Sequence, residues 1–157
     1  MDWTWTTLDI VLRLGAATSA GMIVGLNRDL TNKPIGMRTL ALVALGAAVV
    51  TLSAIQFGEL ALYPDPLSRV VQGVIQGIMA GVSFIGAGVI LRDSKSGTVR
   101  GLTTAATVWV TAALGIACAL GAWRIVLSAI ILTLILLVVV GWIEQRFNLN
   151  GDTDDAR

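Results

Sequence analysis

The side chains most able to do chemistry in this sequence gather in two short polar loops between long apolar runs. Each loop has an Arg-Asp pair where one apolar run ends and another arginine near where the next begins: Arg28, Asp29 and Arg38 in the first, and Arg92, Asp93 and Arg100 in the second. Guanidinium groups bind phosphate and carboxylate oxygens through paired N–H donors. Four arginines against two aspartates therefore predict a positive patch suited to phosphate, a lipid headgroup or an acidic protein surface.

The second loop, within "GAGVILRDSKSGTVRGLTTAA" (86–106), allows two interpretations. It is either a plain hairpin turn that its arginines hold at the membrane surface, or a working site. A hairpin needs only one or two basic anchors and turn residues, not an Arg-Asp pair at one end and Arg-Gly-Leu-Thr-Thr at the other. We favour a site, and we include in the cluster the hydroxyl groups beside both loops: Thr39, Thr103 and Thr104.

No catalytic set is visible in the sequence. Histidine is absent, and the one cysteine, Cys118, lies inside an apolar run. These facts exclude a disulfide or a Cys/His metal site within one chain. No apolar run holds a pair of carboxylates, and no glycine-rich loop precedes a lysine as in phosphate-binding loops. We expect a protein that is not an enzyme, has no cofactor and binds no nucleic acid, with magnesium entering only as a transported or sensed ion.

The composition places these loops in a membrane protein. Of 157 residues, 55% are hydrophobic and 13% are charged, and the mean hydropathy is +0.82. Soluble domains have about a quarter charged residues, and a helix needs about 20 residues to cross the hydrocarbon core. The sequence therefore predicts an all-α, polytopic membrane helix bundle with five transmembrane helices, at about 10–26, 39–57, 70–91, 101–122 and 125–143, and a short flexible tail at 144–157. The last two are separated by a predicted turn at "GAWR" (121–124), because 101–143 is about twice too long for one span.

Basic residues in short loops set the orientation of such a bundle. Eight of the eleven lysines and arginines lie in the two polar loops and the C-terminal tail, whereas Arg13, Arg69 and Arg124 fall on the other side. The basic side is expected to be cytoplasmic. The N-terminus is then outside and the C-terminus is inside.

Small residues in the third predicted span indicate close helix packing. "QGVIQGIMAG" (72–81) spaces Gly73, Gly77 and Gly81 four residues apart, and close backbone contact is what associates helices in lipid. Either a second copy of the chain or its own first span would fill this groove, and we predict a homodimer. Packing is also the expected role of Gly86, Gly88 and Trp109.

Polar residues form further stripes in the spans. Gln72, Gln76 and Ser83 lie beside the glycine groove, and Thr107 and Thr111 line one face of the fourth span. An amide in hydrocarbon is costly without a partner, whereas a threonine can bond a carbonyl of its own helix. These five residues therefore form either a polar path through the membrane or, for the glutamines, hydrogen bonds across a helix interface.

Two stretches resemble the signatures of the MgtC/SapB family. "GLNRDLTNKPIGMRTLALVALGAA" (25–48) is similar to the first, in which a Pro-small-Gly-hydrophobic-Arg-Thr turn opens the second span. "GVSFIGAGVILRDSKSGTVRGLTTAATVWVTAALGIACALG" (81–121) is similar to the second, and together they cover 65 of 157 residues. The matching positions are Arg28, Asp29, Pro34, Gly36, Arg38, Thr39, Gly86, Gly88, Arg92, Asp93, Arg100, Gly101, Thr103, Thr104, Thr107 and Trp109.

The resemblance implies a multi-pass protein of the bacterial inner membrane, associated with growth when magnesium is scarce and, in pathogens, with survival inside macrophages. For the best-known members it implies a regulatory role, including restraint of the rotary ATP synthase, although magnesium transport is the traditional assignment. We expect a non-enzymatic regulator of another membrane complex. The alternative is a small magnesium transporter working as a homo-oligomer, since five spans are few for a pore in one chain.

The sequence departs from the family pattern in two places. Many members have a glutamate where this chain has Asn27, so carboxylate chemistry is not expected there. Virulence-type members also carry a soluble C-terminal domain, and the short tail of this chain favours the SapB-like branch without it.

Overall fold

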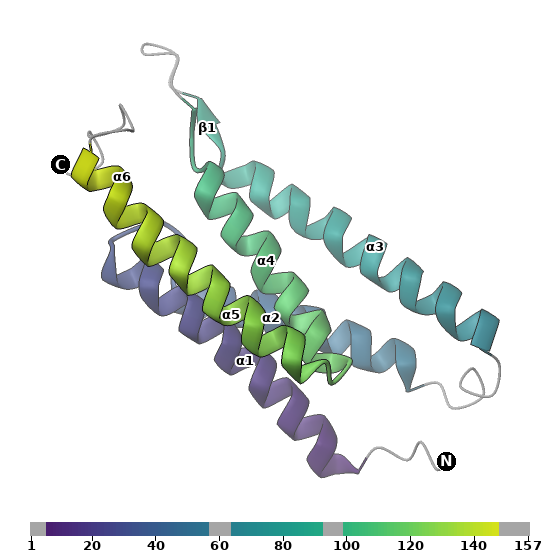
Figure 1. The fold of residues 1–157 in the computed structure, drawn as a ribbon. Coiled ribbons are helices and arrows are strands. Elements are labelled where there is room, and N and C mark those ends of the chain that lie inside the picture. The colour runs from purple at the N-terminus through teal and green to yellow at the C-terminus, as the bar shows by residue number, and fades with distance from the viewer. Residues whose placement is uncertain (1–5, 57–63, 93–98, 148–157) are drawn as a thin grey trace.

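The computed structural model of the protein describes residues 6–56, 64–92 and 99–147. These residues form a helical bundle with one short hairpin of two strands (Figure 1). The elements, in chain order, are α1 (Thr7–Leu30), α2 (Met37–Ile55), α3 (Pro64–Val89), β1 (Leu91–Arg92), β2 (Val99–Arg100), α4 (Leu102–Ala119), α5 (Trp123–Ile135), the π-helical segment η2 (Leu136–Val140) and α6 (Gly141–Phe147).

Five of the described helical segments are long and apolar enough to cross a membrane, which confirms the predicted five-span bundle. The fifth span, Trp123–Ile143, runs through α5 and η2 into α6. The predicted turn between the last two spans is also confirmed, because α4 ends at Ala119 and Gly121 reverses the chain at a φ of +71°. Glycine adopts such a left-handed conformation without steric cost.

The spans alternate in direction. The connection from α1 to α2 and the β1–β2 hairpin lie at one end of the bundle, together with the end of α6, and α1 begins at the other end (Figure 1). This is the arrangement that the predicted topology requires, whereas the side that faces the cytoplasm stays a prediction.

Several helix ends differ from the predicted ones because apolar counting finds the hydrocarbon boundary rather than the helix end. α1 begins at Thr7, where Oγ1 of the N-cap Thr6 accepts a hydrogen bond of 3.3 Å from the amide of Asp9. At the other end of the chain, α6 continues to Phe147, so 144–147 is helix and not part of a flexible tail. Glutamate, glutamine and arginine are good helix formers, which explains this extension. Residues 148–157 lie outside the described residues.

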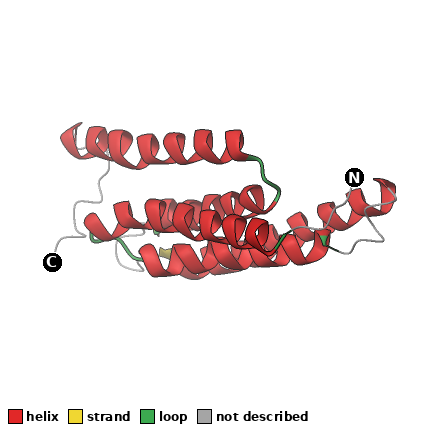
Figure 2. Ribbon diagram, turned by 90° about the horizontal axis from the view of Figure 1, so that it is seen from below, coloured by secondary structure: helices red, strands yellow, loops and turns green. Residues whose placement is uncertain are grey.

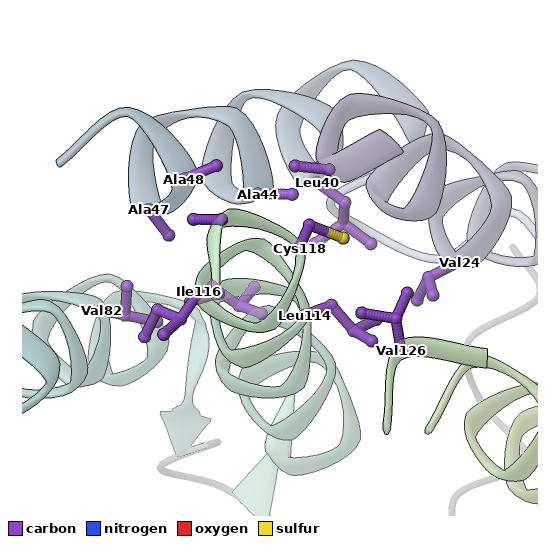
Figure 3. Packing of buried hydrophobic residues seen from close by; sticks show 14 of the residues in the cluster. Val24, Leu40, Ala44, Ala47, Ala48, Val82, Leu114, Ile116, Cys118 and Val126 are labelled. Carbon is purple, nitrogen blue, oxygen red and sulfur yellow. The ribbon is translucent and has the colours of Figure 1, made fainter. Parts of the chain in front are cut away.

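The core is built from α1, α2 and α4, with α4 at its centre. In α4, 56% of the span is buried, the largest share of the five. Figure 3 shows the small and medium apolar side chains that meet there, among them Val24 of α1, Ala44 of α2 and Leu114 of α4. Because many of these side chains are alanines, the helix backbones come close together, as association in lipid requires.

Three glycines make the closest approaches between these helices. A Cβ atom at Gly21 would lie 2.5 Å from the carbonyl oxygen of Leu40, one at Gly25 would overlap the backbone of Met37, and one at Gly115 would overlap the carbonyl oxygen of Ala44. Gly21 and Gly25 thus hold α1 against α2, and Gly115 holds α4 against α2.

The glycines of α3 that were predicted to pack do not hold α3 closely against another helix of the same chain. A Cβ at Gly73, Gly77, Gly81 or Gly88 would meet nothing within 4 Å, and at Gly86 it would make an ordinary contact of 3.4 Å with Ala105. The sequence allowed two partners for this groove, a second copy or the chain's own first span. The second of these is wrong, because no described helix of the chain fills the groove. Packing of Gly88 against a helix of another chain stays a prediction.

Trp109, for which the sequence predicts a packing role, is not buried within the chain. Its side chain is 47% exposed, at the edge of a groove between α3 and α4. It faces outward because the buried side of α4 is occupied by smaller residues one position away, such as Val108.

Two spans lie at the periphery of the bundle. Only 11% of the α3 span and 6% of the last span are buried. Figure 2 shows the last span as a separate row beside the other helices, and Val126, near its beginning, is its one fully buried residue among those described. Both spans therefore present long apolar faces that the rest of the chain does not cover.

Candidate functional site at the loop end of the bundle

Arg28 is the most enclosed charged side chain at this end of the described bundle. It lies in the last turn of α1, is 5% exposed, and donates a hydrogen bond from Nη2 to Oγ1 of Thr104 in the first turn of α4. Thr104 is itself only 3% exposed. The buried Nε of Arg28 has no hydrogen-bond partner in the described part of the protein. A cation is thus held between α1 and α4 by one neutral acceptor.

Asp29, the next residue, has a structural task. Its Oδ2 accepts a hydrogen bond of 2.9 Å from the amide of Met37, the first residue of α2. A carboxylate at a helix N-terminus satisfies an amide that has no partner within the helix, and it interacts favourably with the helix dipole. A Cβ at Gly36 would overlap the carboxylate of Asp29, so a larger residue at this position would displace the cap. Asp29 therefore caps α2 rather than pairing with Arg28.

The backbone between these two helices takes an unusual path to make this cap. Asn32 and Ile35 both have positive φ angles, 52° and 61°. Such a conformation is uncommon for a non-glycine residue and is costly for a β-branched one. The loop thus bears local strain in order to bring the N-terminus of α2 under the carboxylate of Asp29.

The second loop enters α4 through a short pair of strands. β1 pairs antiparallel with β2, so that Leu91 lies opposite Arg100 and Arg92 opposite Val99. Gly101 follows as the N-cap of α4 with a φ of +88° and a ψ of 0°, and it has no side chain to bond the free amides of the first turn. A Cβ at Gly101 would overlap the carbonyl oxygen of Val89 at the end of α3.

The predicted cluster therefore separates into two groups, one at each helix N-terminus. Asp29, Arg38 and Thr39 belong to α2, where both Arg38 and Thr39 are exposed. Arg28, half-buried Arg100, exposed Thr103 and buried Thr104 surround the beginning of α4. The side chain of Arg92 and the whole of Asp93 lie outside the described residues.

The polar residues predicted for a path are not brought together within one chain. Thr107 and Thr111 are buried in α4, and their hydroxyls donate to the carbonyls of Thr103 and Thr107, at 2.7 Å and 2.8 Å. Ser83 likewise donates to the carbonyl of Met79 at 2.7 Å. Of the two roles considered for these hydroxyls, a polar path or a hydrogen bond within the same helix, the structure shows the second.

The two glutamines lie elsewhere. Gln72 and Gln76 are exposed on α3, in an open groove of about 680 Å³ along that helix. Thr107 and Thr111 face the core of α1, α2 and α4, so a path that includes all of these residues does not exist within one chain.

Arg13 makes a structural contact that the sequence did not predict. Its Nη1 donates a hydrogen bond of 2.7 Å to the carbonyl of Ala119, and its guanidinium carbon lies 5.9 Å from the centre of the Trp123 ring. It thereby joins α1 to the turn between α4 and α5, at the C-terminal end of α4, where the helix dipole favours a positive charge. The available signal was an arginine inside an apolar run, together with a glycine-tryptophan turn elsewhere in the chain.

Replacing Arg13 with methionine is expected to lower the free energy of unfolding by roughly 1.5–3 kcal/mol, because a hydrogen bond from a charged donor is lost. The measurement is unfolding of the purified protein by sodium dodecyl sulfate in mixed micelles. Arg124→Met is the matched control, since the Arg124 side chain is exposed near the same turn. Equal losses in both variants would show that the contact of Arg13 with Ala119 contributes nothing.

Comparisons with known proteins agree with the signatures. Residues 14–146 match the MgtC family. The chain is 36% identical to Protein SapB of Bacillus subtilis over 88% of this chain and 59% of SapB. It is 43% identical to Protein SrpB of Synechococcus elongatus, over 93% and 84% of the two chains, and 38% identical to Protein MgtC of Salmonella typhimurium, over 88% and 55%. The chain thus spans a little over half the length of SapB and MgtC, and no solved structure matches it.

Proposed function

The chain belongs to the MgtC family, and from this premise we propose that it is a non-enzymatic regulator of another membrane complex, acting in adaptation to low magnesium. It is a multi-pass membrane protein of that family. Its location in the inner membrane of a bacterium is part of the proposal. So are the contribution of magnesium as a sensed ion and the link to virulence.

The observation that carries the proposal is the contrast between a closed core and two open spans. α1, α2 and α4 pack closely, whereas only 11% of the α3 span and 6% of the last span are buried. Lipid is as apolar as these faces, so exposure of leucine or valine alone demands no partner. The exposed amides of Gln72 and Gln76 do favour a protein partner, because an amide in hydrocarbon is costly without a hydrogen bond.

The glycine stripe lies beside these amides on the same helix. Gly73, Gly77 and Gly81 are exposed and open, so a second helix can approach the α3 backbone closely there. We assign this face to a helix from another protein or from a second copy of the chain. A homodimer through α3 would place the amides of both copies near each other across a two-fold axis.

A magnesium transporter working as such a dimer is the second candidate. It is favoured by the position of Gln72 and Gln76, since two copies would bring four amides together on the dimer axis. Hard divalent cations prefer carboxylate and carbonyl oxygens, and among the described residues no group of three or more histidines, cysteines, aspartates or glutamates could hold a metal ion. Regulation is therefore the first choice.

Gly77→Leu is expected to abolish most of the growth that the wild-type gene restores to a deletion strain in low-magnesium medium. Leucine adds bulk to the stripe, and a Cβ at this position would meet nothing within 4 Å from the other helices of the chain. Gly46→Leu is the matched control, since Gly46 on α2 is equally open. Both variants must reach the membrane in wild-type amounts.

Three results would contradict the proposal. Full complementation by Gly77→Leu would remove the α3 face from the function. Equal failure of Gly46→Leu would show that any added bulk is harmful. Magnesium flux into liposomes above that of empty liposomes would establish the transporter instead. Crosslinking then identifies the partner of this face. Loss of a crosslinked dimer in Gly77→Leu indicates a second copy, and an unchanged dimer indicates another protein.

A further inference from the structure

We propose that Arg28 and the N-terminus of α4 form a binding site for a phosphate group. This site goes beyond the regulatory function, and its test requires neither the partner complex nor a cell. The site comprises the Arg28 side chain, the amides of the first turn of α4, and the neighbouring Arg100 and Thr104. The tip of the hairpin is not part of it.

The first observation is the charge of Arg28. The side chain is 5% exposed, the hydrogen bond to Thr104 is the one that it makes within the described residues, and its buried Nε has no hydrogen-bond partner. A guanidinium has five N–H donors in a planar fork. A buried charge that is neither paired nor fully hydrogen-bonded costs several kcal/mol. An anion with several acceptor oxygens would satisfy these remaining donors.

The second observation is the place to which Arg28 extends. Thr104 is the third residue of α4, and the first intrahelical bond at this end runs from the amide of Ala105 to the carbonyl of Gly101. The amides of residues 102–104 therefore have no partner within the helix. The N-cap, Gly101, has no side chain that could bond them. Free amides at a helix N-terminus bind phosphate, and the helix dipole adds to the attraction.

At the N-terminus of α2, an amide without a partner in the helix is bonded by a side chain of the same chain. There the carboxylate of Asp29 accepts a hydrogen bond from the first amide of the helix. At α4 the chain instead supplies a buried cation, with Arg100 directly before the N-cap. An oxyanion from outside the chain would accept hydrogen bonds from the first amides of α4, as the carboxylate of Asp29 does at α2. Phosphate fits best, because its several oxygens can accept from the arginine fork and from backbone amides together.

A phosphate group at this end of a membrane protein can come from a lipid headgroup or from solution. An apolar groove of about 480 Å³ runs between α3 and α4 and begins beside the site, with Ile90, Ala105 and Trp109 among its lining residues. An acyl chain would fit there, so both sources are included in the test.

The experiment measures thermal unfolding of the purified full-length protein in dodecyl maltoside micelles. One arm titrates inorganic phosphate against chloride at constant ionic strength, and the other titrates phosphatidylglycerol against phosphatidylcholine. We expect a saturable rise of the unfolding midpoint in at least one arm. Arg28→Gln is expected to weaken the apparent affinity at least about tenfold. Arg38→Gln removes an exposed arginine at the same end and is expected to leave the affinity within about twofold of wild type.

The outcomes separate the explanations. A rise in the phosphate arm identifies a dissolved ion, and a rise in the lipid arm alone identifies a headgroup. No saturable rise in either arm would overturn the proposal, as would wild-type affinity in Arg28→Gln or an equal loss in Arg38→Gln. If Arg28→Gln does not fold, Arg28→Lys keeps the charge and removes the fork. Wild-type affinity in that variant would exclude recognition by the guanidinium.

Discussion

Gly101→Ala is expected to leave little folded protein in the membrane and to destabilise what remains by roughly 2–5 kcal/mol. Two costs add at this position. The φ of +88° is unfavourable for a residue with a Cβ, and that Cβ would overlap the carbonyl oxygen of Val89. The overlap is with backbone, so only a shift of α3 away from α4 relieves it. The measurements are the yield in the membrane fraction and the thermal midpoint in detergent.

Gly88→Ala is the matched control for this variant. Gly88 lies in the last turn of α3, close in sequence to Val89, and a Cβ there would meet nothing within 4 Å. Alanine is the better helix former by about 1 kcal/mol, so the control is expected to be neutral or slightly stabilising. Wild-type yield and stability in Gly101→Ala would contradict the left-handed conformation of Gly101 and its close contact with Val89.

Gly115→Ala is expected to lower the free energy of unfolding by about 1–3 kcal/mol, the usual cost of an overpacked core. The new methyl group would overlap the carbonyl oxygen of Ala44 and lie 3.0 Å from its Cα. Because α4 is the most buried span, a shift there also disturbs the contacts with α1. Unfolding by sodium dodecyl sulfate in mixed micelles measures the difference.

Gly77→Ala makes the same substitution on α3, where a Cβ has nothing within 4 Å. This variant is expected to gain up to about 1 kcal/mol from helix propensity. The opposite order, with Gly77→Ala the less stable of the two, would contradict both the close contact of Gly115 with Ala44 and the open position of Gly77.

The spans were predictable from sequence because their length follows from the thickness of the bilayer. The same holds for the turn at Gly121, since an apolar run of twice that length has to reverse. The packing glycines were predictable only in part, because Gly21 and Gly25 share the four-residue spacing of Gly73 and Gly77, yet only the first pair lies against another helix of the chain. Four-residue spacing shows that a helix has a smooth face, as at Gly73 and Gly77, but not that another helix lies on it. Gly115 has no glycine partner in such a motif, and only the position of Ala44 on α2 makes it essential.

The candidate site was predictable as a set of residues and not as an arrangement. The pattern placed Arg28 and Asp29 side by side at the end of a span, where both were expected to serve one cluster. In the structure they turn to different helices: Asp29 caps α2 and Arg28 is buried against α4. This division depends on the left-handed backbone at Asn32 and Ile35. Asparagine is enriched in that conformation, but no residue preference would have indicated it for the β-branched Ile35.

The hydrogen bonds of α1 also determine when this protein can finish assembling during its synthesis. Arg13 and Arg28 are made with the first span, but their acceptors, Ala119 and Thr104, follow 106 and 76 residues later. At roughly 5–20 residues per second the delay is from about 4 to about 20 seconds. During that interval both guanidiniums must be solvated by water, by headgroups or by the insertion machinery, because hydrocarbon does not hold them. The fourth span to leave the ribosome is therefore the one whose arrival lets the first settle in the bilayer.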